Sequence, residues 1–259
     1  GDHRDLHVSI RRQRQMCIRD STDITHYLPI KSESNEFFCN ANGSGRPEII
    51  ICSYNPLVWN EEIVLDQIFY TSGLGGIYPR NIDENDVYII TGSQSAVYEK
   101  HDWLENLFEF VREINKKEIG LIGICFGHQA IAHALGGNVE KAKSGWHIGL
   151  KPLEVQDNEL FKRRSYQLIF NHQDQVINPP SNAVCIGATD HCRYALMIIG
   201  KHIISCQGHV EFSKEYAREL LDMRRKIFGE NEYQKAVDSL KNRDDSVEFF
   251  QEVISFFMN

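Results

Sequence analysis

The sequence lacks long apolar runs, a surplus of positive charge and paired cysteines, and each absence excludes a class of protein. None of its apolar stretches approaches the ~20 residues that a membrane-spanning helix needs, so we expect no membrane partner. Against 36 acidic residues there are only 28 lysines and arginines, and the net charge of −8 argues against a nucleic-acid partner. The seven cysteines include no CxxC pair and no metal-ligand spacing. We therefore expect no disulfide framework, no metal and a reducing, cytoplasmic compartment.

The first 21 residues resemble a translated sequencing-library adapter rather than protein. Gly1–His7 and Arg11–Ser21 follow the standard-code translation of its two constant parts, and Val8–Ile10 lie where the variable index would fall. Translated adapter residues carry no information about the fold, and we expect 1–21 to be disordered and without function. A basic N-terminal arm or an arginine-rich transit peptide is the alternative. Residues 22–46 form a polar lead-in, and one domain is expected over 47–259.

Short apolar runs alternate with amphipathic stretches in the expected domain. Strands buried on both faces are predicted at 49–52, 87–90 and 120–124, and helices at 60–70, 102–116 and 127–135. This order is typical of an α/β domain with a mostly parallel, doubly wound sheet flanked by helices. Further strands are predicted near 148–155, 167–171, 184–189, 194–199 and 202–206, and helices near 213–228, 231–241 and 246–257.

The strongest local pattern is G-I-C-F-G-H-Q at residues 123–129. It places Cys125 between a predicted buried strand and a small-residue helix, which is typical of a nucleophile elbow. A helix N-terminus favours the thiolate form of cysteine, and the amide of Phe126 would point to where an oxyanion forms. The alternative is that Cys125 is a small buried hydrophobe at the end of a strand.

A thiol nucleophile needs a base, and one of the eleven histidines has a carboxylate suitably spaced to orient it. His209 and Glu211 follow a predicted strand, where the period of two sends both side chains to the same side. Glu211 can then bind one imidazole nitrogen, so that the other nitrogen faces the thiol. The alternative is a surface strand end that carries two polar residues.

Two loops add candidate binding residues. The T-G-S-Q-S loop at 91–95 follows a predicted strand, and the amide of Gly92 or Ser93 could complete an oxyanion hole with Phe126. An ordinary strand-to-helix turn explains this loop equally well. In N-H-Q-D-Q-V at 171–176, His172 and Asp174 could meet the charged amino-acid head of a substrate, or simply close a turn.

Taken together, these four motifs resemble the class I glutamine amidotransferase family over about residues 48–228, and most nearly the stand-alone proteins related to the amidotransferase domain of GMP synthase. The resemblance implies a flavodoxin-like fold and a Cys125–His209–Glu211 triad. It implies hydrolysis of the glutamine side-chain amide through a γ-glutamyl thioester, with Gln129 as a substrate contact and Gly92 near the oxyanion. The sequence departs from the family at Val210, where relatives usually have proline, and at Phe126, where they often have tyrosine.

Three functions remain open. The first is a glutamine amidotransferase or glutaminase; because the sequence has no ATP-binding glycine loop, its ammonia would go to a separate synthetase partner. The second is a γ-glutamyl peptidase that acts on glutathione conjugates or γ-glutamyl peptides with the same triad. The third is a non-catalytic regulator that binds a metabolite, suggested by the broad apolar face of 247–257, although covering the sheet is the simpler use of that face. No cofactor is expected.

Overall fold

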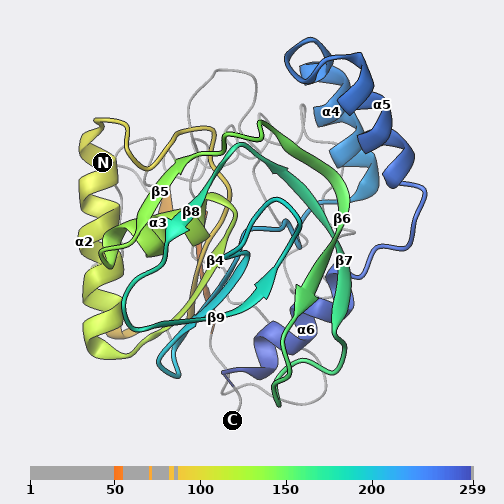
Figure 1. Cartoon of the computed structure of the whole chain (residues 1–259). Helices are drawn as coiled ribbons and strands as arrows, with labels where there is room; N and C mark the ends of the chain where they lie inside the picture. The colour runs from red at the N-terminus through yellow and green to blue at the C-terminus, as the bar shows by residue number, and fades with distance from the viewer. Residues whose placement is uncertain (1–49, 55–69, 72–81, 85–86, 258–259) are drawn as a thin grey trace, which may run out of the picture.

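The computed structural model describes residues 50–54, 70–71, 82–84 and 87–257 (Figure 1). The predictions made for residues 1–21, for the lead-in at 22–46 and for a helix at 60–70 lie outside these ranges. Within them, no helix is both long enough and apolar enough to cross a membrane.

The described strands form a nine-stranded sheet in the order β2-β1-β3-β4-β11-β10-β9-β6-β7, together with a separate β5-β8 pair. The strands are β1 (Ile50–Tyr54), β2 (Tyr70–Thr71), β3 (Val87–Ile90), β4 (Gly120–Ile124), β5 (Asn138–Lys141), β6 (His147–Val155), β7 (Ser165–His172), β8 (Asp174–Asn178), β9 (Ala183–Ala188), β10 (Leu196–Ile199) and β11 (Ile203–Cys206). The sequence predicts all of these strands except β2, β5 and β8, which lack a clear apolar run.

The described α-helices lie close to their predicted positions. They are α2 (Asp102–Lys117), α3 (Phe126–Ala134), α4 (Lys214–Phe228), α5 (Glu230–Ser239) and α6 (Ser246–Ser255). The short 3-10 helix η2 (Ile82–Glu84) is not predicted from the sequence. Ser213 caps α4, because its hydroxyl accepts a 2.9 Å hydrogen bond from the amide of Tyr216. Gly136, at φ 90°, follows the end of α3 in a conformation that favours glycine.

The sheet is mixed. Its centre is parallel, because β3 and β11 both run parallel to β4. The other pairings between the described strands are antiparallel. A strand that returns after a short turn, as β11 does after β10, must run antiparallel, whereas parallel neighbours need a longer crossover. The predicted α/β class is confirmed, and the mostly parallel arrangement is limited to the central strands.

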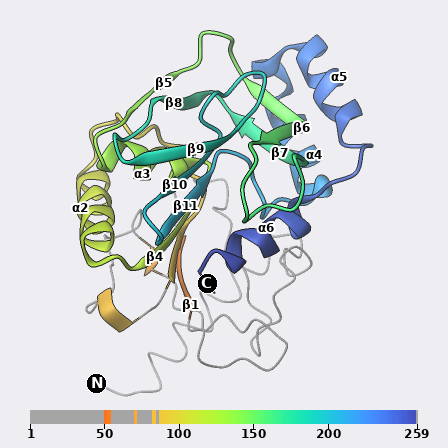
Figure 2. The same cartoon turned by 60° about the horizontal axis from the view of Figure 1, so that its bottom comes forward.

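Helices cover both faces of the central strands, with α2 and α3 on one side and α6 on the other (Figures 1 and 2). The alternation of side chains along each strand divides the core accordingly. On β4, Leu121 lies in the cluster with α2 and α3, whereas Ile122 and Ile124 lie in the cluster with α6. The α4–α5 hairpin packs separately, against β6 and β7.

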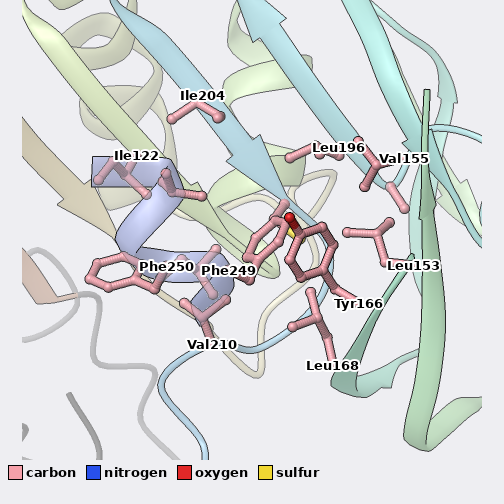
Figure 3. Close-up of a cluster of buried hydrophobic side chains, with 14 of the residues drawn as sticks. Ile122, Leu153, Val155, Tyr166, Leu168, Leu196, Ile204, Val210, Phe249 and Phe250 are labelled. Carbon is pink, nitrogen blue, oxygen red and sulfur yellow. The ribbon is translucent and has the colours of Figure 1, made fainter. Parts of the chain in front are cut away.

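The apolar face of α6 packs against the sheet (Figure 3). Phe249 and Phe250 are 0% and 2% exposed, and they pack with Val253 against Ile122 and Ile204 of the sheet. The expectation that this face covers the sheet is therefore confirmed. It no longer supports a docking role for the C-terminal segment.

Candidate active site

Cys125 lies on a sharp turn between β4 and α3, where the sequence predicts a nucleophile elbow. Its backbone has φ 53° and ψ −101°, a strained conformation for a residue that is not glycine. The amide of Cys125 donates a 2.9 Å hydrogen bond to the carbonyl of Cys206, which ties the turn to the end of β11. The side chain is buried in the core between the sheet and α6.

The glycines on both sides of Cys125 are required by close packing. A Cβ atom on Gly127 would lie 2.0 Å from the carbonyl oxygen of Ile90, and one on Gly123 would lie 2.8 Å from the carbonyl oxygen of Gly127. Both neighbours are backbone atoms, which cannot move aside as the end of a side chain could. The expected close packing of the start of α3 against the sheet is therefore confirmed.

His209 and Glu211 lie together, as the period of two predicts. Nδ1 of His209 is 2.7 Å from Oε1 of Glu211, and the amide of His209 donates a 2.7 Å hydrogen bond to the carbonyl of Ile169 on β7. Because a carboxylate only accepts, Nδ1 carries the proton in this pair. Cys125 lies close enough to the ring to act on its pKa, so Cys125, His209 and Glu211 form one set. Val210, in the usual place of proline, points into the core and leaves this contact intact.

The surroundings of His209 favour the positively charged form of its ring. Burial acts to lower the pKa of His209, but the negative charges of Cys125 and Glu211 and their hydrogen bonds act against it and raise the pKa to about 10. The raised pKa favours a positive imidazolium beside the sulfur of Cys125 at neutral pH. Such a pair combines a nucleophile with a proton donor.

Neighbouring groups hold the ring of His209 in place. Phe212 stacks on it with ring centroids 3.8 Å apart and an angle of 12° between the planes, and Tyr216 packs edge-on against Phe212. On the T-G-S loop, a Cβ on Gly92 would lie 3.2 Å from Cε1 of His209. The loop at 91–95 therefore approaches the site closely, as expected. Ser93 of this loop accepts a hydrogen bond from the amide of Ser95.

Gln129 is buried beneath this site, and both hydrogens of its amide are engaged. Its Nε2 donates to the carbonyl oxygen of Asp174 at 2.6 Å and to Oε1 of Gln207 at 3.2 Å. A contact between Gln129 and a substrate would therefore use Oε1 as an acceptor. The side chain of Asp174 accepts a 3.0 Å hydrogen bond from the hydroxyl of Tyr98. Neither Gln207 nor Tyr98 is singled out by the sequence analysis.

His172 is in a different environment from Asp174. Its ring packs edge-on against His147 and Phe170, and neither of its nitrogens has a hydrogen-bond partner among the described residues. Burial, followed by the nearby histidines, holds the pKa of His172 well below its ordinary value, so the ring is neutral. The structure therefore does not support a charged contact between His172 and a substrate.

Phe126 is the first residue of α3, and its buried side chain contacts Trp103. A phenylalanine therefore occupies the position at which relatives often have tyrosine.

The other described thiols are not part of the set formed by Cys125, His209 and Glu211. Burial raises the pKa of Cys192 to about 12 and that of Cys206 to about 12, which disfavours their thiolates. Within the described ranges, no group of three or more histidine, cysteine or acidic side chains is placed to hold a metal ion.

Comparison with known proteins identifies the family of this chain. The profile of the family described as Glutamine amidotransferase class-I matches residues 77–224. Gamma-glutamyl peptidase 2 of Arabidopsis thaliana is 34% identical over 178 residues, which cover 65% of this chain and 72% of that protein. A GMP synthase of Thermosipho melanesiensis is 33% identical over 109 residues, which cover 41% of this chain but only 20% of that protein.

Among solved structures, a glutamine amidotransferase from Thermotoga maritima superposes with a TM-score of 0.61 at 21% identity. The alignment covers 71% of this chain and 84% of that chain. At this identity the likeness shows the fold, and the α/β arrangement flanked by helices is shared.

Proposed function

Because the chain belongs to the class I glutamine amidotransferase family, we propose that it is a cysteine-dependent hydrolase of γ-glutamyl amide bonds. Cys125 is the nucleophile, His209 the acid and base, and Glu211 the group that orients and charges the imidazole. The observation that carries this proposal is the buried set in which His209 lies 2.7 Å from Glu211 and close enough to Cys125 for the two groups to interact electrostatically. Structural roles alone do not explain why an imidazole, a carboxylate and a thiol are buried together, with the thiol on a strained turn.

The reaction follows from the charges of the pair. The Cys125 thiolate attacks the γ-carbonyl carbon, and the C–N bond breaks as the His209 imidazolium donates its proton to the leaving amine. The product at this stage is a γ-glutamyl thioester and a neutral imidazole. Water then attacks the thioester while His209 takes its proton, the C–S bond breaks, and glutamate leaves with the thiolate restored. No cofactor is required for these steps.

The oxyanion of each tetrahedral intermediate needs donors close to Cys125. The amide of Phe126 lies at the start of α3, and the loop of Gly92 and Ser93 approaches the ring of His209. Backbone amides at a helix start and on a glycine loop are suited to this role, because they are held in place before charge develops. We assign the oxyanion hole to these amides.

γ-Glutamyl peptides are the first candidate substrates, because a relative 34% identical carries the name of a γ-glutamyl peptidase. This reverses the order of the first two functions in the sequence analysis. Glutamine is the second candidate, favoured by the match to GMP synthases, in which case a synthetase partner would take the ammonia. Both candidates share the γ-glutamyl group and the same bond to be broken.

The test is to incubate the purified protein separately with glutamine, glutathione, a glutathione S-conjugate and a γ-glutamyl dipeptide, and to identify the products. We expect glutamate from the peptides at a higher kcat/KM than from glutamine, and no turnover by Cys125→Ala. A faster release of ammonia from glutamine would favour the second candidate. No turnover of any γ-glutamyl compound would support the non-catalytic alternative.

A chemical label provides an independent test. A glutamine-mimicking electrophile should alkylate Cys125, whereas Cys185, Cys192 and Cys206 should remain unmodified because burial raises the pKa of each of these thiols. Peptide mapping by mass spectrometry would locate the adduct. Preferential labelling of any other cysteine would contradict the assignment of the nucleophile.

A further inference from the structure

A buried amide faces the sulfur of Cys125. Nε2 of Gln207 lies 3.6 Å from Sγ of Cys125, within hydrogen-bonding range for a sulfur acceptor, and Gln207 is 0% exposed. Its backbone is tied by the amide, which donates a 2.8 Å hydrogen bond to the carbonyl of Ala195. Gln207 is therefore a neighbour of the thiol that is buried from solvent and held in place by its backbone.

The orientation of this amide is determined by its other contacts. The carbonyl of Asp174 can only accept, so the end of Gln129 that faces it at 2.6 Å must be the NH2 group. That same NH2 group lies 3.2 Å from Gln207, so the atom of Gln207 facing it must be the acceptor Oε1. The NH2 group of Gln207 is then left facing the sulfur. A flipped amide would place two donors against each other at Gln129 and an oxygen against the thiolate.

We infer that Gln207 is a positioning residue that stabilises the Cys125 thiolate through a hydrogen bond from its side-chain amide, with Gln129 holding that amide in the donating orientation. This inference deepens the proposed function and rests on Cys125 being the nucleophile. A hydrogen bond to a charged acceptor is stronger than one to the neutral thiol, because the charge draws the donor in. The amide therefore favours the thiolate before the substrate arrives.

Gln207 also complements His209 rather than duplicating it. His209 must release its proton to the leaving amine, and at that stage its positive charge no longer acts on the sulfur. The amide of Gln207 keeps its hydrogens throughout the cycle, so it can stabilise the thiolate again when the thioester is hydrolysed. Two donors on the sulfur, one that transfers its proton and one that does not, are consistent with a leaving group that must form in the second half of the reaction.

The test measures the thiolate itself. The rate at which iodoacetamide alkylates Cys125 is followed against pH by mass spectrometry in the wild type, in Gln207→Met and in Gln207→Glu. Gln207→Met retains the volume but donates nothing, so we expect the midpoint of the alkylation profile to rise by about one pH unit, an about tenfold loss of thiolate below the midpoint. Gln207→Glu places a carboxylate near the sulfur and should raise the midpoint at least as far. Gln251→Met, on the exposed face of α6, is the matched control and should not move it.

The outcomes separate this inference from the proposed function. If Cys125→Ala retains turnover, the nucleophile is wrong and both proposals are overturned. If Cys125→Ala is inactive but both Gln207 variants, shown to be folded by circular dichroism, keep the wild-type midpoint, only the role of Gln207 is overturned. A loss of thermal stability with an unchanged midpoint would likewise show that Gln207 fills space. A rise in the midpoint in folded Gln207→Met supports the inference, whereas a rise in Gln207→Glu alone, which charge repulsion explains, overturns it.

Discussion

At the scale of single residues, the candidate site depends on how the ring of His209 is held. Glu211 binds Nδ1, Phe212 covers one face of the ring, and Gly92 closely approaches its Cε1 edge. An imidazole restrained in this way has little freedom to turn its second nitrogen away from Cys125. Each restraint can be removed separately, because the groups come from different positions and act by different forces.

Glu211→Gln tests the charge of the carboxylate. The amide oxygen of glutamine can still accept a hydrogen bond from Nδ1, but it no longer stabilises the imidazolium, so the pKa of His209 should fall. We expect kcat to drop on the order of 10²- to 10⁴-fold, because an orienting carboxylate in a triad contributes this much. Steady-state kinetics measure the effect, and Glu219→Gln, on the exposed side of α4, is the control. A reduction below threefold would contradict the role of Glu211.

Phe212→Leu tests the stacked ring. Leucine retains much of the apolar volume but offers no flat surface to His209, and an aromatic pair of this kind contributes about 0.5–1.5 kcal/mol beyond its buried area. We expect kcat to fall by up to roughly tenfold with little change in KM, because the substrate does not need to touch Phe212. Phe212→Tyr retains the ring and should retain most of the activity. Equal losses in both variants would show that the flat ring is not the relevant feature.

At the scale of elements, the turn from β4 into α3 decides whether the site can form. The helix begins directly after Cys125, and it can do so only because its first turn lies against the backbone of β3 without side chains between them. The strain at Cys125 is maintained by this packing and by the hydrogen bond from its amide to Cys206. The elbow therefore depends on three strands of the sheet, β3, β4 and β11.

Gly127→Ala should break this junction. The new Cβ would lie 2.0 Å from a backbone oxygen of Ile90, which cannot move aside as a side chain could. We expect a destabilisation of ~3 kcal/mol or more and a loss of activity, measured by urea unfolding and by turnover. Gly136→Ala is the contrasting variant: nothing lies within 4 Å of its Cβ, so only the strain of φ 90° applies. Its cost should be about 1 kcal/mol, and its activity should be retained.

At the scale of the whole molecule, buried neutral histidines couple stability to pH. His147 stacks between Phe170 and His191, and burial, then the charge of His191, lowers its pKa to about 3. Burial likewise lowers the pKa of His128 to about 4, although the ring is hydrogen-bonded to Tyr194 and Ser205. The unfolded chain then binds more protons than the folded one between the ordinary histidine pKa of 6.5 and these lowered values. The free energy of unfolding therefore decreases as the pH falls below 6.5. The raised pKa of His209 has the opposite effect: its contribution to stability is lost as the pH rises from 6.5 to about 10.

His147→Phe measures one part of this effect. Phenylalanine can stack in the same place but cannot take a proton, so the slope of unfolding free energy against pH between pH 6 and pH 4 should decrease by about 1.4 kcal/mol per pH unit. Urea unfolding at several pH values gives this slope. The exposed His101→Gln is the control and should leave the slope near that of the wild type. An unchanged slope in His147→Phe would mean that His147 is not the buried neutral group described here.

Several parts of the fold and the site follow from local sequence because they depend on near neighbours in the chain. The elbow is readable from a small residue on each side of Cys125 and an apolar run before it, and the His209–Glu211 pair is readable from a period of two. The same period also places Gln207 on the side of His209, so that residue could have been found in the motif already quoted. By contrast, no local sequence pattern predicts that the ring of His172 is buried or that Tyr98 hydrogen-bonds Asp174, because these contacts join distant segments.

The amino-acid sequence by itself determined the α/β class, the central strands, the elbow at Cys125 and the spacing of His209 and Glu211, since each rests on backbone preferences and periodicity within a few residues. Only the tertiary structure decided that the flanking strands run antiparallel, that α6 covers the sheet, and that the amide of Gln207 faces the thiol. Those features depend on which distant segments pack together, and the free energy of that packing is shared across the core rather than written in any one stretch of the chain.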